Sequence, residues 1–308
     1  MKQVCIPMPI INRISKFIRC YANINGLRFK DSDLLFCTIS NDEFVAGTIV
    51  MIYSMKKHLP KFHKYKIRIF FDNYISPLSV KNRQLLSSLG NNIELIEIED
   101  EVYRNARCKH EKHRLAYLTI ETFSQRDFSK IIFFDGDMLV LNDFTNALDF
   151  SFPIFGSKAG KFKSTKGPKF KWRAINTGLF GVDTLQIPND TYNMLKKIIM
   201  NRNDNNTELL DQKIINNYFS QLKCPQLLIH HFYNFRDYGA SGNGSESFFK
   251  KHRSNIKILH FSGYELRPKP WEKDRVSKMG LKNHAAYKLW RDYAYDLQKE
   301  LPISKYLF

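Results

Sequence analysis

Apolar segments of strand length alternate with segments of helical pattern over residues 34–134, and this alternation limits the possible folds more than any other feature. The strand-like segments are "LLFCTI" (34–39), "YKIRIFFDN" (65–73), "NIELIEI" (92–98) and "KIIFF" (130–134). The helical patterns between them are "EFVAGTIVMIYSMKKHL" (43–59), "SVKNRQLLSSLG" (79–90) and "HEKHRLAYLTIETF" (110–123). Strands that alternate with helices predict an α/β fold with a largely parallel sheet covered on both faces.

The second half of the chain continues with fewer strands. The predicted elements are a strand at "INTGLFGVD" (175–183), helices at "DTYNMLKKIIM" (190–200) and "TELLDQKIINNYF" (207–219), a strand at "NIKILHFSG" (255–263) and a final helix at "NHAAYKLWRDYAYDLQKEL" (283–301). No internal repeat or clear linker divides the chain. We therefore expect a single domain over 34–271, preceded by a basic extension (1–33) and followed by a helical extension (272–308).

The chain is strongly basic, with a formal net charge of +18 over 308 residues. This charge attracts polyanions, phosphorylated ligands or an anionic membrane surface without choosing among them. A nucleic-acid-binding protein is therefore a rival reading, but no recognised nucleic-acid motif is present, and the basic residues are dispersed apart from one segment, 157–173. We expect no nucleic-acid partner.

The cysteines and the hydropathy pattern indicate the cellular compartment in which we expect the protein. Five cysteines are scattered without a CxxC pair, which favours reduced thiols over a disulfide framework or a zinc site. No run of 18 apolar residues is long enough to cross a bilayer. We expect a cytoplasmic protein, either soluble or peripherally bound to the inner face of the membrane.

Polar turns follow two of the predicted strands, and ligands of α/β sheets bind at such carboxyl ends. One is Ser40-Asn41-Asp42, and the other is Asp135-Gly136-Asp137. Two acids one residue apart repel each other unless a cation lies between them, and Mg²⁺ or Mn²⁺ would suit their oxygens and accept phosphate oxygens from a substrate. Gly136 permits the dihedrals that converging acids need. The alternative is an ordinary surface turn, in which Asp and Gly are common.

Five segments, in the same order along the chain, resemble the glycogenin-like retaining glycosyltransferases of family 8, which include bacterial lipooligosaccharide galactosyltransferases. The segments are "FCTISNDEFVAGTIVMIYSM", "FFDGDMLVLND" with its DxD motif, "INTGLFGVD", "LLDQKIINNYF" and "LHFSGYELRPKPW". The resemblance covers about 34–271. It implies a GT-A type domain with a Rossmann-like central mixed sheet flanked by helices.

The resemblance also implies a metal centre and a diphosphate contact. Asp135, Asp137 and His260 would bind Mn²⁺ or Mg²⁺, and Lys269 would contact the diphosphate of the donor. This chain has additional residues between Gly263 and Lys269 compared with the family pattern, which leaves the reach of the lysine open. Taken alone, His260 would be read as structural and Lys269 as a solvated side chain.

The first strand and its turn would bind the nucleotide. By resemblance, Thr38, Ile39 and Ser40 line the uridine site and Asn41 closes the turn. Phe44 stands where many family members have a base-stacking tyrosine; the alternative is that its ring packs beneath the following helix. Arg114 occupies a helix position where the family has a basic residue that touches the donor.

The remaining implied contacts are with the donor sugar. Asn176, Thr177 and Gly178 match the sugar-contacting strand, where an amide bonds hydroxyls and a glycine allows close approach. Asp211 and Gln212 match a pair whose carboxylate binds donor hydroxyls and whose amide lies near the anomeric carbon. Either of them is a candidate for stabilising an oxocarbenium-like state.

The implied reaction is transfer of a hexosyl unit from a UDP-sugar, with retention of configuration, to a glycan or glycolipid such as a lipopolysaccharide core. The basic segment 157–173 would meet a phosphorylated acceptor or would be a solvated loop. The final helix and the N-terminal stretch "INRISKFIRCY" would contact a membrane or pack on the domain. A catalytically silent member of the same fold is a further alternative.

Overall fold

Seven strands form the central sheet of the computed structural model, in the order β3-β2-β1-β4-β7-β6-β8. The structure describes residues 33–146, 152–159, 174–201, 210–222, 224, 226–236, 246–263 and 267–308. The strands are β1 (Leu34–Ile39), β2 (Lys66–Phe71), β3 (Ile93–Glu97), β4 (Lys130–Phe134), β6 (Ile154–Lys158), β7 (Ile175–Asp183) and β8 (Gln226–Ile229). Strand β7 is antiparallel to both of its neighbours, and the other pairs are parallel. The mixed, mainly parallel sheet is the one predicted.

A separate two-stranded sheet lies beside the central one. It consists of β5 (Met138–Val140) and β9 (Ile258–His260), which are antiparallel. Its register pairs Met138 with His260 and Val140 with Ile258. This register brings a residue near the C-terminal end of the domain next to the turn that follows β4.

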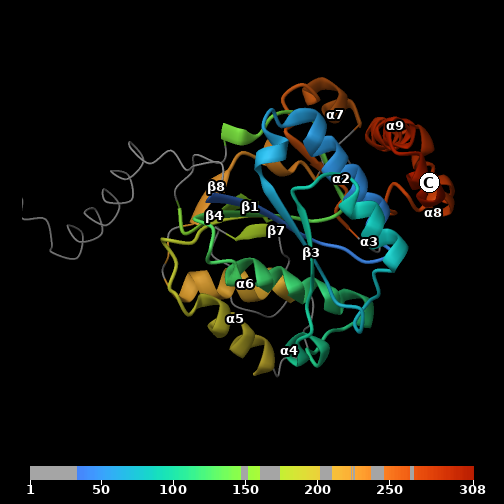
Figure 1. Cartoon of the computed structure of the whole chain (residues 1–308). Helices are drawn as coiled ribbons and strands as arrows, with labels where there is room; N and C mark the ends of the chain where they lie inside the picture. The colour runs from blue at the N-terminus through green and yellow to red at the C-terminus, as the bar shows by residue number, and fades with distance from the viewer. Residues whose placement is uncertain are drawn as a thin grey trace, which may run out of the picture.

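Helices cover both faces of the central sheet, as Figure 1 shows. The helices are α2 (Val45–His58), α3 (Val80–Ser87), α4 (Glu101–Arg104), α5 (Thr191–Met200), α6 (Leu210–Gln221), α7 (Glu246–His252), α8 (Lys273–Lys278) and α9 (Ala285–Glu300), with 3-10 segments η3 (Phe62–Lys64), η4 (Glu111–Ser124), η6 (His231–Asn234), η7 (Leu281–Asn283) and η8 (Pro302–Leu307). Alternate residues of β1 enter different cores: Phe36 packs with α2 and α3, and Leu35 packs with η4, α5 and α6. Each face of the sheet is therefore closed by its own hydrophobic core.

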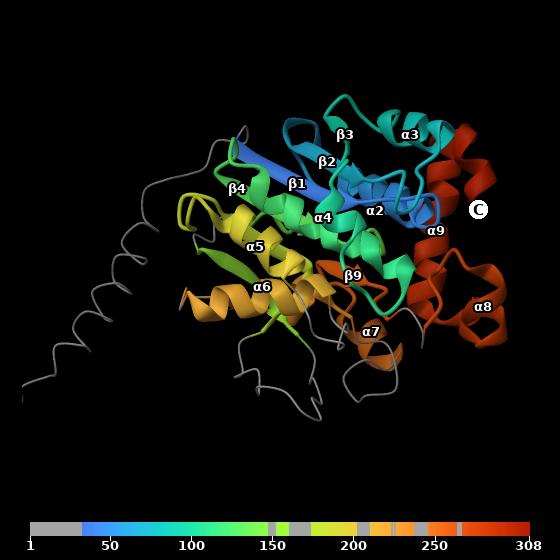
Figure 2. The same cartoon turned by 90° about the horizontal axis from the view of Figure 1, so that it is seen from below.

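The C-terminal helix α9 packs against α2, and Figure 2 shows the two at one end of the molecule. Lys57 forms an ion pair with Asp296 at 2.8 Å, and the Tyr53 hydroxyl donates to Glu300 at 2.5 Å. Trp290, on the apolar side of α9, is buried in the core. The apolar side of α9 thus packs on the domain, which was one of the two alternatives for this helix. Contact of the helix with a membrane stays a prediction.

The sequence patterns located most elements but not all of their details. The segment at 110–123, predicted as a helix, is the 3-10 helix η4, and the strand predicted at 255–263 is confined to β9. Strands β5, β6 and β8 were not predicted. The extension 1–32, including "INRISKFIRCY", and most of the basic segment 157–173 lie outside the described residues, and the division into 1–33, 34–271 and 272–308 stays a prediction.

Two further observations concern the described residues. Among the described residues, Cys37, Cys108 and Cys224 form no disulfide bond. Within the described ranges, no helix has both the length and the apolar character required to span a bilayer.

Candidate active site

The carboxyl ends of β1 and β4 meet at one edge of the sheet because these strands are adjacent and parallel. The polar turns that follow them, 40–42 and 135–137, are therefore neighbours. A Cβ atom added at Gly136 would lie 2.7 Å from Thr48 Oγ1 of α2 and 3.5 Å from the carbonyl oxygen of Ile39 at the end of β1, so glycine lets the turn after β4 approach both elements closely. The φ of Gly136 is not positive, so the expectation that this glycine supplies an unusual dihedral is wrong, and the glycine is needed for space. The prediction that both turns lie at carboxyl strand ends is confirmed.

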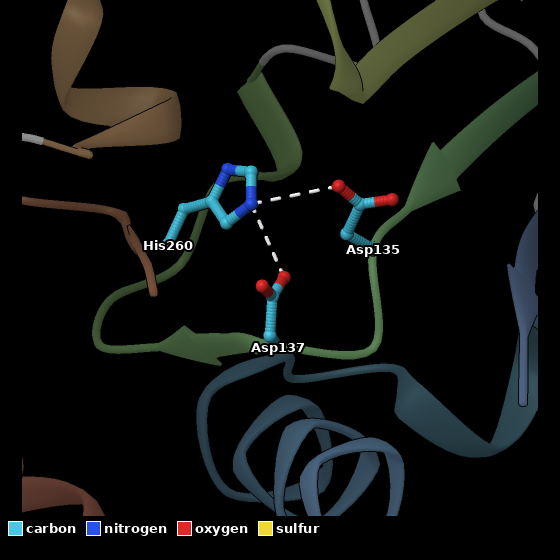
Figure 3. A group of neighbouring side chains, drawn as sticks. All are labelled: Asp135, Asp137 and His260. Carbon is cyan, nitrogen blue, oxygen red and sulfur yellow. Dashed lines mark ion pairs between the residues drawn. The ribbon is translucent and has the colours of Figure 1, made fainter. Parts of the chain in front are cut away.

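Asp135, Asp137 and His260 converge at this edge, as Figure 3 shows. Strand β5 begins directly after Asp137, and its pairing with β9 places His260 beside the two acids. His260 Nε2 lies 3.1 Å from Asp137 Oδ1 and 3.5 Å from Asp135 Oδ2. One ligand atom from each residue lies within 4.8 Å of the others. We call these three residues the DDH cluster; two carboxylates and an imidazole are a donor set suited to Mn²⁺.

The two acids of the DDH cluster differ in environment. The side chain of Asp137 is 6% exposed and that of Asp135 is 44% exposed. Burial acts to raise the pKa of Asp137, but the Lys269 ammonium outweighs it and holds this pKa well below its usual range. Desolvation, followed by the charges of Asp137 and Asp211, raises the pKa of Asp135, although its exposed fraction lets solvent weaken all three effects.

One carboxylate oxygen of Asp137 lacks a partner within the described part of the protein and is suited to bind a metal ion. Its Oδ1 atom is buried and has no hydrogen-bond partner among the described residues. The nearby His260 is neutral at neutral pH because burial lowers its pKa, against the opposing pull of Asp137. Neutral imidazole is the form that binds metal ions. An unpaired buried oxygen and a neutral imidazole, next to a second carboxylate, therefore fit a divalent cation.

Lys269 reaches the DDH cluster despite the additional residues that precede it. Its ammonium donates to Asp137 Oδ2 and, at 2.9 Å, to the carbonyl oxygen of Phe261. The side chain is 7% exposed. Gly263, earlier in the same segment, has a φ of 102°, a conformation that favours glycine. The structure thus brings Lys269 to the centre, and its contact with a diphosphate stays a prediction.

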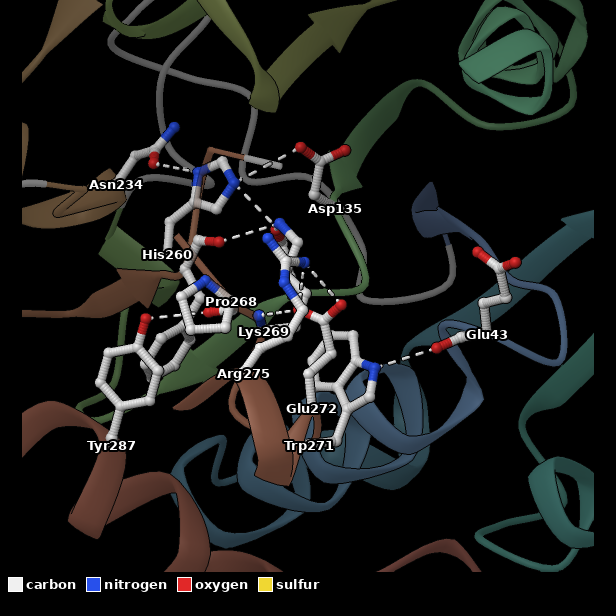
Figure 4. Close-up of polar contacts among 12 residues, drawn as sticks. Glu43, Asp135, Asn234, His260, Pro268, Lys269, Trp271, Glu272, Arg275 and Tyr287 are labelled. Carbon is white, nitrogen blue, oxygen red and sulfur yellow. Dashed lines mark hydrogen bonds and ion pairs between the residues drawn. The ribbon is translucent and has the colours of Figure 1, made fainter. Parts of the chain in front are cut away.

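The segment that carries this lysine is held in place by two aromatic side chains, as Figure 4 shows. The Tyr287 hydroxyl of α9 donates to the carbonyl oxygen of Pro268 at 2.9 Å. Trp271 Nε1 donates to the carbonyl oxygen of Glu43 at 2.9 Å. The Trp271 ring also meets the Phe44 ring edge to face, with centroids 5.7 Å apart. The C-terminal helix and the turn before α2 therefore hold the same segment from two sides.

The start of β7 and the start of α6 form the next wall of the site. Asn176 Nδ2 and the backbone N–H of Thr177 both donate to Gln212 Oε1, at 2.9 and 3.2 Å. The Thr177 hydroxyl donates to the carboxylate of Asp211. Burial raises the pKa of Asp211 to about 6, against these hydrogen bonds, and the charge of Asp211 in turn acts on Asp135. The predicted sugar-contacting residues are thus brought together beside the DDH cluster.

Gly178 has a steric role that sequence reasoning did not identify. Its expected role was to let the donor sugar approach the backbone. In the structure, a Cβ atom at this position would lie 2.4 Å from His260 Cε1 and 2.6 Å from Asp135 Oδ2. The absence of a side chain therefore lets the DDH cluster close, and the role toward a sugar stays a prediction.

The turn after β1 is braced by hydrogen bonds from its polar side chains. Ser40 Oγ lies 3.0 Å from Thr48 Oγ1, and Asn41 Nδ2 donates to Ser76 Oγ at 2.7 Å. Thr38 Oγ1 is buried with no hydrogen-bond partner in the described part of the chain. The uridine contacts of this turn stay a prediction.

The Phe44 ring does not pack wholly beneath α2, which was one of its two expected positions. Its ring is half-buried against Trp271, and the Lys269 ammonium lies 5.8 Å from the ring centroid. The ring therefore borders the candidate site rather than packing wholly beneath α2. Base stacking by Phe44 stays a prediction.

Arg114 is engaged within its own region of the fold. Its guanidinium donates to the carbonyl oxygen of Arg104 at 2.7 Å and pairs with Glu111 at 2.7 Å. Both contacts lie around η4, and neither involves the DDH cluster. Its contact with a donor stays a prediction.

Asn234 is a site residue that sequence reasoning missed. It lies in η6, in a stretch without a recognised motif, and its Oδ1 is 2.9 Å from His260 Nδ1. Trp271 was noted as part of a motif but not as a support of the site. The position of Asn234 depends on the tertiary fold, so no spacing in the sequence could have indicated it.

A family model for glycosyl transferase family 8 matches residues 36–275. The chain belongs to glycosyltransferase family 8. This match confirms the resemblance drawn from the five sequence segments. No curated protein sequence matches the chain.

Solved structures share the fold of this family 8 member. Galactosyltransferase LgtC, solved with donor and acceptor sugar analogues, is 15% identical over 85% of this chain and 95% of its own, with a TM-score of 0.58. WbbM, a bifunctional glycosyltransferase, is 17% identical over 87% of this chain and 52% of its own, with a TM-score of 0.60. GlyE of Streptococcus pneumoniae TIGR4 is 16% identical over 84% of this chain and 59% of its own, with a TM-score of 0.54. At such identities the likeness establishes the fold, which is of the GT-A type.

Proposed function

We propose that this glycosyltransferase is a retaining, metal-dependent hexosyltransferase that moves a hexosyl unit from a UDP-sugar to a glycan or glycolipid acceptor. The observation that carries the proposal is the convergence of the DDH cluster and Lys269 at the carboxyl edge of the sheet. Family membership and the LgtC-like fold support it. Two acids and an imidazole beside a buried ammonium form a place for a cation and a diphosphate together.

The roles on the leaving-group side follow from charge. Asp135, Asp137 and His260 would hold Mn²⁺ or Mg²⁺, which when bound neutralises the diphosphate. The Lys269 ammonium would stabilise the charge that builds on the leaving diphosphate from another side. Its buried position next to Asp137 keeps it in place before the donor arrives.

The roles on the sugar side follow from hydrogen-bonding capacity. The Asp211 carboxylate can accept bonds from donor hydroxyls, and it is a candidate for stabilising an oxocarbenium-like state while the acceptor attacks from the leaving-group face. The Gln212 amide oxygen already accepts two bonds within the protein, which leaves its NH₂ group for the substrate. Asp211 is therefore the better candidate for charge stabilisation.

The donor is tested by a UDP-release screen. Purified protein is incubated with Mn²⁺ and, in turn, UDP-glucose, UDP-galactose, UDP-N-acetylglucosamine and UDP-N-acetylgalactosamine, and any hydrolysed sugar is identified by mass spectrometry. We expect release from one donor and its loss in EDTA. Release from none of the donors would favour a silent member of the fold.

The rival reading as a nucleic-acid-binding protein has a separate test. Thermal stabilisation by UDP with Mn²⁺, and none by RNA in the absence of Mg²⁺, is expected of the transferase. The opposite result would favour the rival reading.

Asp211 gives a prediction on pH. Its pKa is raised to about 6 in the folded protein, whereas in the unfolded chain it is about 3.9. Between these two pKa values, Asp211 keeps its proton in the folded state and has released it in the unfolded state. The contribution of Asp211 to the free energy of unfolding is therefore present at low pH and is lost as the pH rises through about 6.

In Asp211→Asn this loss of stability with rising pH cannot occur, because the amide does not ionise. Relative to the wild type, the free energy of unfolding of the metal-free variant is expected to increase from about pH 4 to about pH 7, by at most about 3 kcal/mol. Urea unfolding in EDTA across this range measures the difference. UDP release by the wild type should fall below about pH 6, where the carboxylate is protonated. A stability difference that does not change with pH would contradict the assignment.

Acceptor recognition is assigned to the segment 157–173, of which the structure describes Ser157, Lys158 and Ala159. We propose that its lysines meet a phosphorylated glycolipid. Peripheral contact with the inner face of a membrane belongs to the same proposal, and co-sedimentation with anionic vesicles before and after removal of "INRISKFIRCY" would measure it.

A further inference from the structure

A chain of amide side chains leads from β7 to the DDH cluster. It begins at the backbone N–H of Thr177, which donates to Gln212 Oε1 at 3.2 Å. A backbone N–H can only donate, so the Gln212 amide must turn its oxygen, and not its nitrogen, toward β7. The main chain therefore fixes the orientation of this first amide.

That oxygen fixes the next two amides in turn. The atom of Asn176 that lies 2.9 Å from Gln212 Oε1 must be the donor, Nδ2. Asn176 Oδ1 then faces Asn234, whose Nδ2 donates to it at 2.9 Å. Asn234, which is 2% exposed, is left with its Oδ1 directed at His260 Nδ1, 2.9 Å away. We call Gln212, Asn176 and Asn234 the amide relay.

The last member of the chain is the imidazole, shown with Asn234 in Figure 4. Asn234 Oδ1 can only accept, so His260 Nδ1 must carry a hydrogen. In the neutral ring Nε2 then has a free lone pair. That atom faces Asp137 Oδ1 at 3.1 Å and Asp135 Oδ2 at 3.5 Å. Three acceptor atoms thus face one another, which is the arrangement that a cation requires.

We propose that Asn234 is a positioning residue that fixes the Nδ1–H tautomer of His260, so that Nε2 is presented to the metal ion. The inference rests on the proposed function, because the ion is the one that would hold the diphosphate. Loss of a partner that orients a metal-binding histidine typically costs about 10- to 100-fold in metal affinity. The amide relay also joins the predicted sugar-contacting wall to the metal ligand, through Gln212 and Asn176.

Asn234 could instead be only a buried residue that supports the fold. In that case its replacement would lower stability without changing the tautomer of His260. The two roles are therefore separated by a direct observation of the imidazole nitrogens in the metal-free protein.

The first experiment is ¹⁵N NMR of histidine-labelled, metal-free protein, with His260 assigned by its loss in His260→Gln. The proposal predicts the Nδ1–H form in the wild type, whereas a histidine free in water favours Nε2–H. In Asn234→Leu, which cannot accept a hydrogen bond, the proton is expected on Nε2, where Asp137 Oδ1 can accept it. In Asn234→Asp, which keeps an acceptor, the Nδ1–H form is expected to remain.

The second experiment measures Mn²⁺ affinity by the electron paramagnetic resonance signal of the free ion, without donor. Asn234→Leu is expected to weaken binding about 10- to 100-fold, and Asn234→Asp to recover most of it. The control is Asn92→Leu: Asn92 donates to the carbonyl oxygens of Phe62 and Tyr65 just before β3, at the amino edge of the sheet, opposite the site. This control should lose stability but not Mn²⁺ affinity.

The outcomes separate this inference from the proposed function. An Nε2–H tautomer in the wild type, or an unchanged tautomer in Asn234→Leu, would overturn the inference whatever the activity. Failure of the proposed function would appear as no UDP release, and the tautomer and Mn²⁺ measurements would still read out the role of Asn234. If Asn234→Leu does not fold, the wild-type tautomer and Asn234→Asp still decide the question.

Discussion

Asp135→Ala and Asp137→Ala are both expected to abolish metal-dependent UDP release, but only Asp137→Ala is expected to destabilise the metal-free protein. Asp137 forms a buried ion pair with Lys269, and removing one partner of such a pair typically costs about 3–5 kcal/mol of unfolding free energy. Asp135 is more exposed, and its ionised form is opposed by desolvation and by the charges of Asp137 and Asp211. Its removal relieves this repulsion and should leave the metal-free protein as stable as the wild type or more stable.

The measurement is urea unfolding in EDTA, together with Mn²⁺ binding and UDP release for each variant. Asp292→Ala, which removes an exposed acid of α9, is the matched control for loss of one negative charge and should change none of the three. A large loss of stability in Asp135→Ala, or none in Asp137→Ala, would contradict the described division of roles between the two acids.

The sequence was sufficient for five of the seven strands of the central sheet, β1 to β4 and β7, and for the identity of the converging acids. The alternation of strands and helices predicted β1 to β4, because period and length are local properties of the chain. The turns after β1 and β4 could be placed at one edge because parallel neighbours end on the same side. Short strands such as β5 and β6 escaped detection, because a three- to five-residue apolar run has no distinctive period.

The details of the site depend on contacts between distant segments. The pairing of Met138 with His260 joins residues more than one hundred positions apart, and only the resemblance to a family linked them in advance. No local pattern could have placed Asn234 against the imidazole or shown that Lys269 pairs with Asp137. Residue types thus indicated the chemistry, whereas the hydrogen-bond partners that tune it came from the tertiary structure.

Gly178→Ala is expected to reduce Mn²⁺ affinity about 10- to 100-fold, the typical loss when the groups that orient metal ligands are disturbed. The added methyl group would lie 2.4 Å from His260 Cε1 and 2.6 Å from Asp135 Oδ2. The imidazole cannot yield without breaking its hydrogen bond to Asn234, and the carboxylate would have to turn away from it. Two of the three ligands therefore move apart.

Mn²⁺ binding is titrated in the absence of donor. This separates the two possible roles of Gly178, which are to leave space for the metal ligands and to leave space for the donor sugar. If glycine serves only the approach of the donor sugar, Mn²⁺ affinity without donor stays at the wild-type value and only the KM for the donor rises. The control is Gly90→Ala, where the added methyl would lie 2.5 Å from Asn92 Oδ1, a side-chain amide just before β3 at the opposite edge of the sheet. The control adds the same methyl group away from the DDH cluster and should therefore keep the wild-type Mn²⁺ affinity. A loss of Mn²⁺ affinity confined to Gly178→Ala places the steric requirement at the metal ligands.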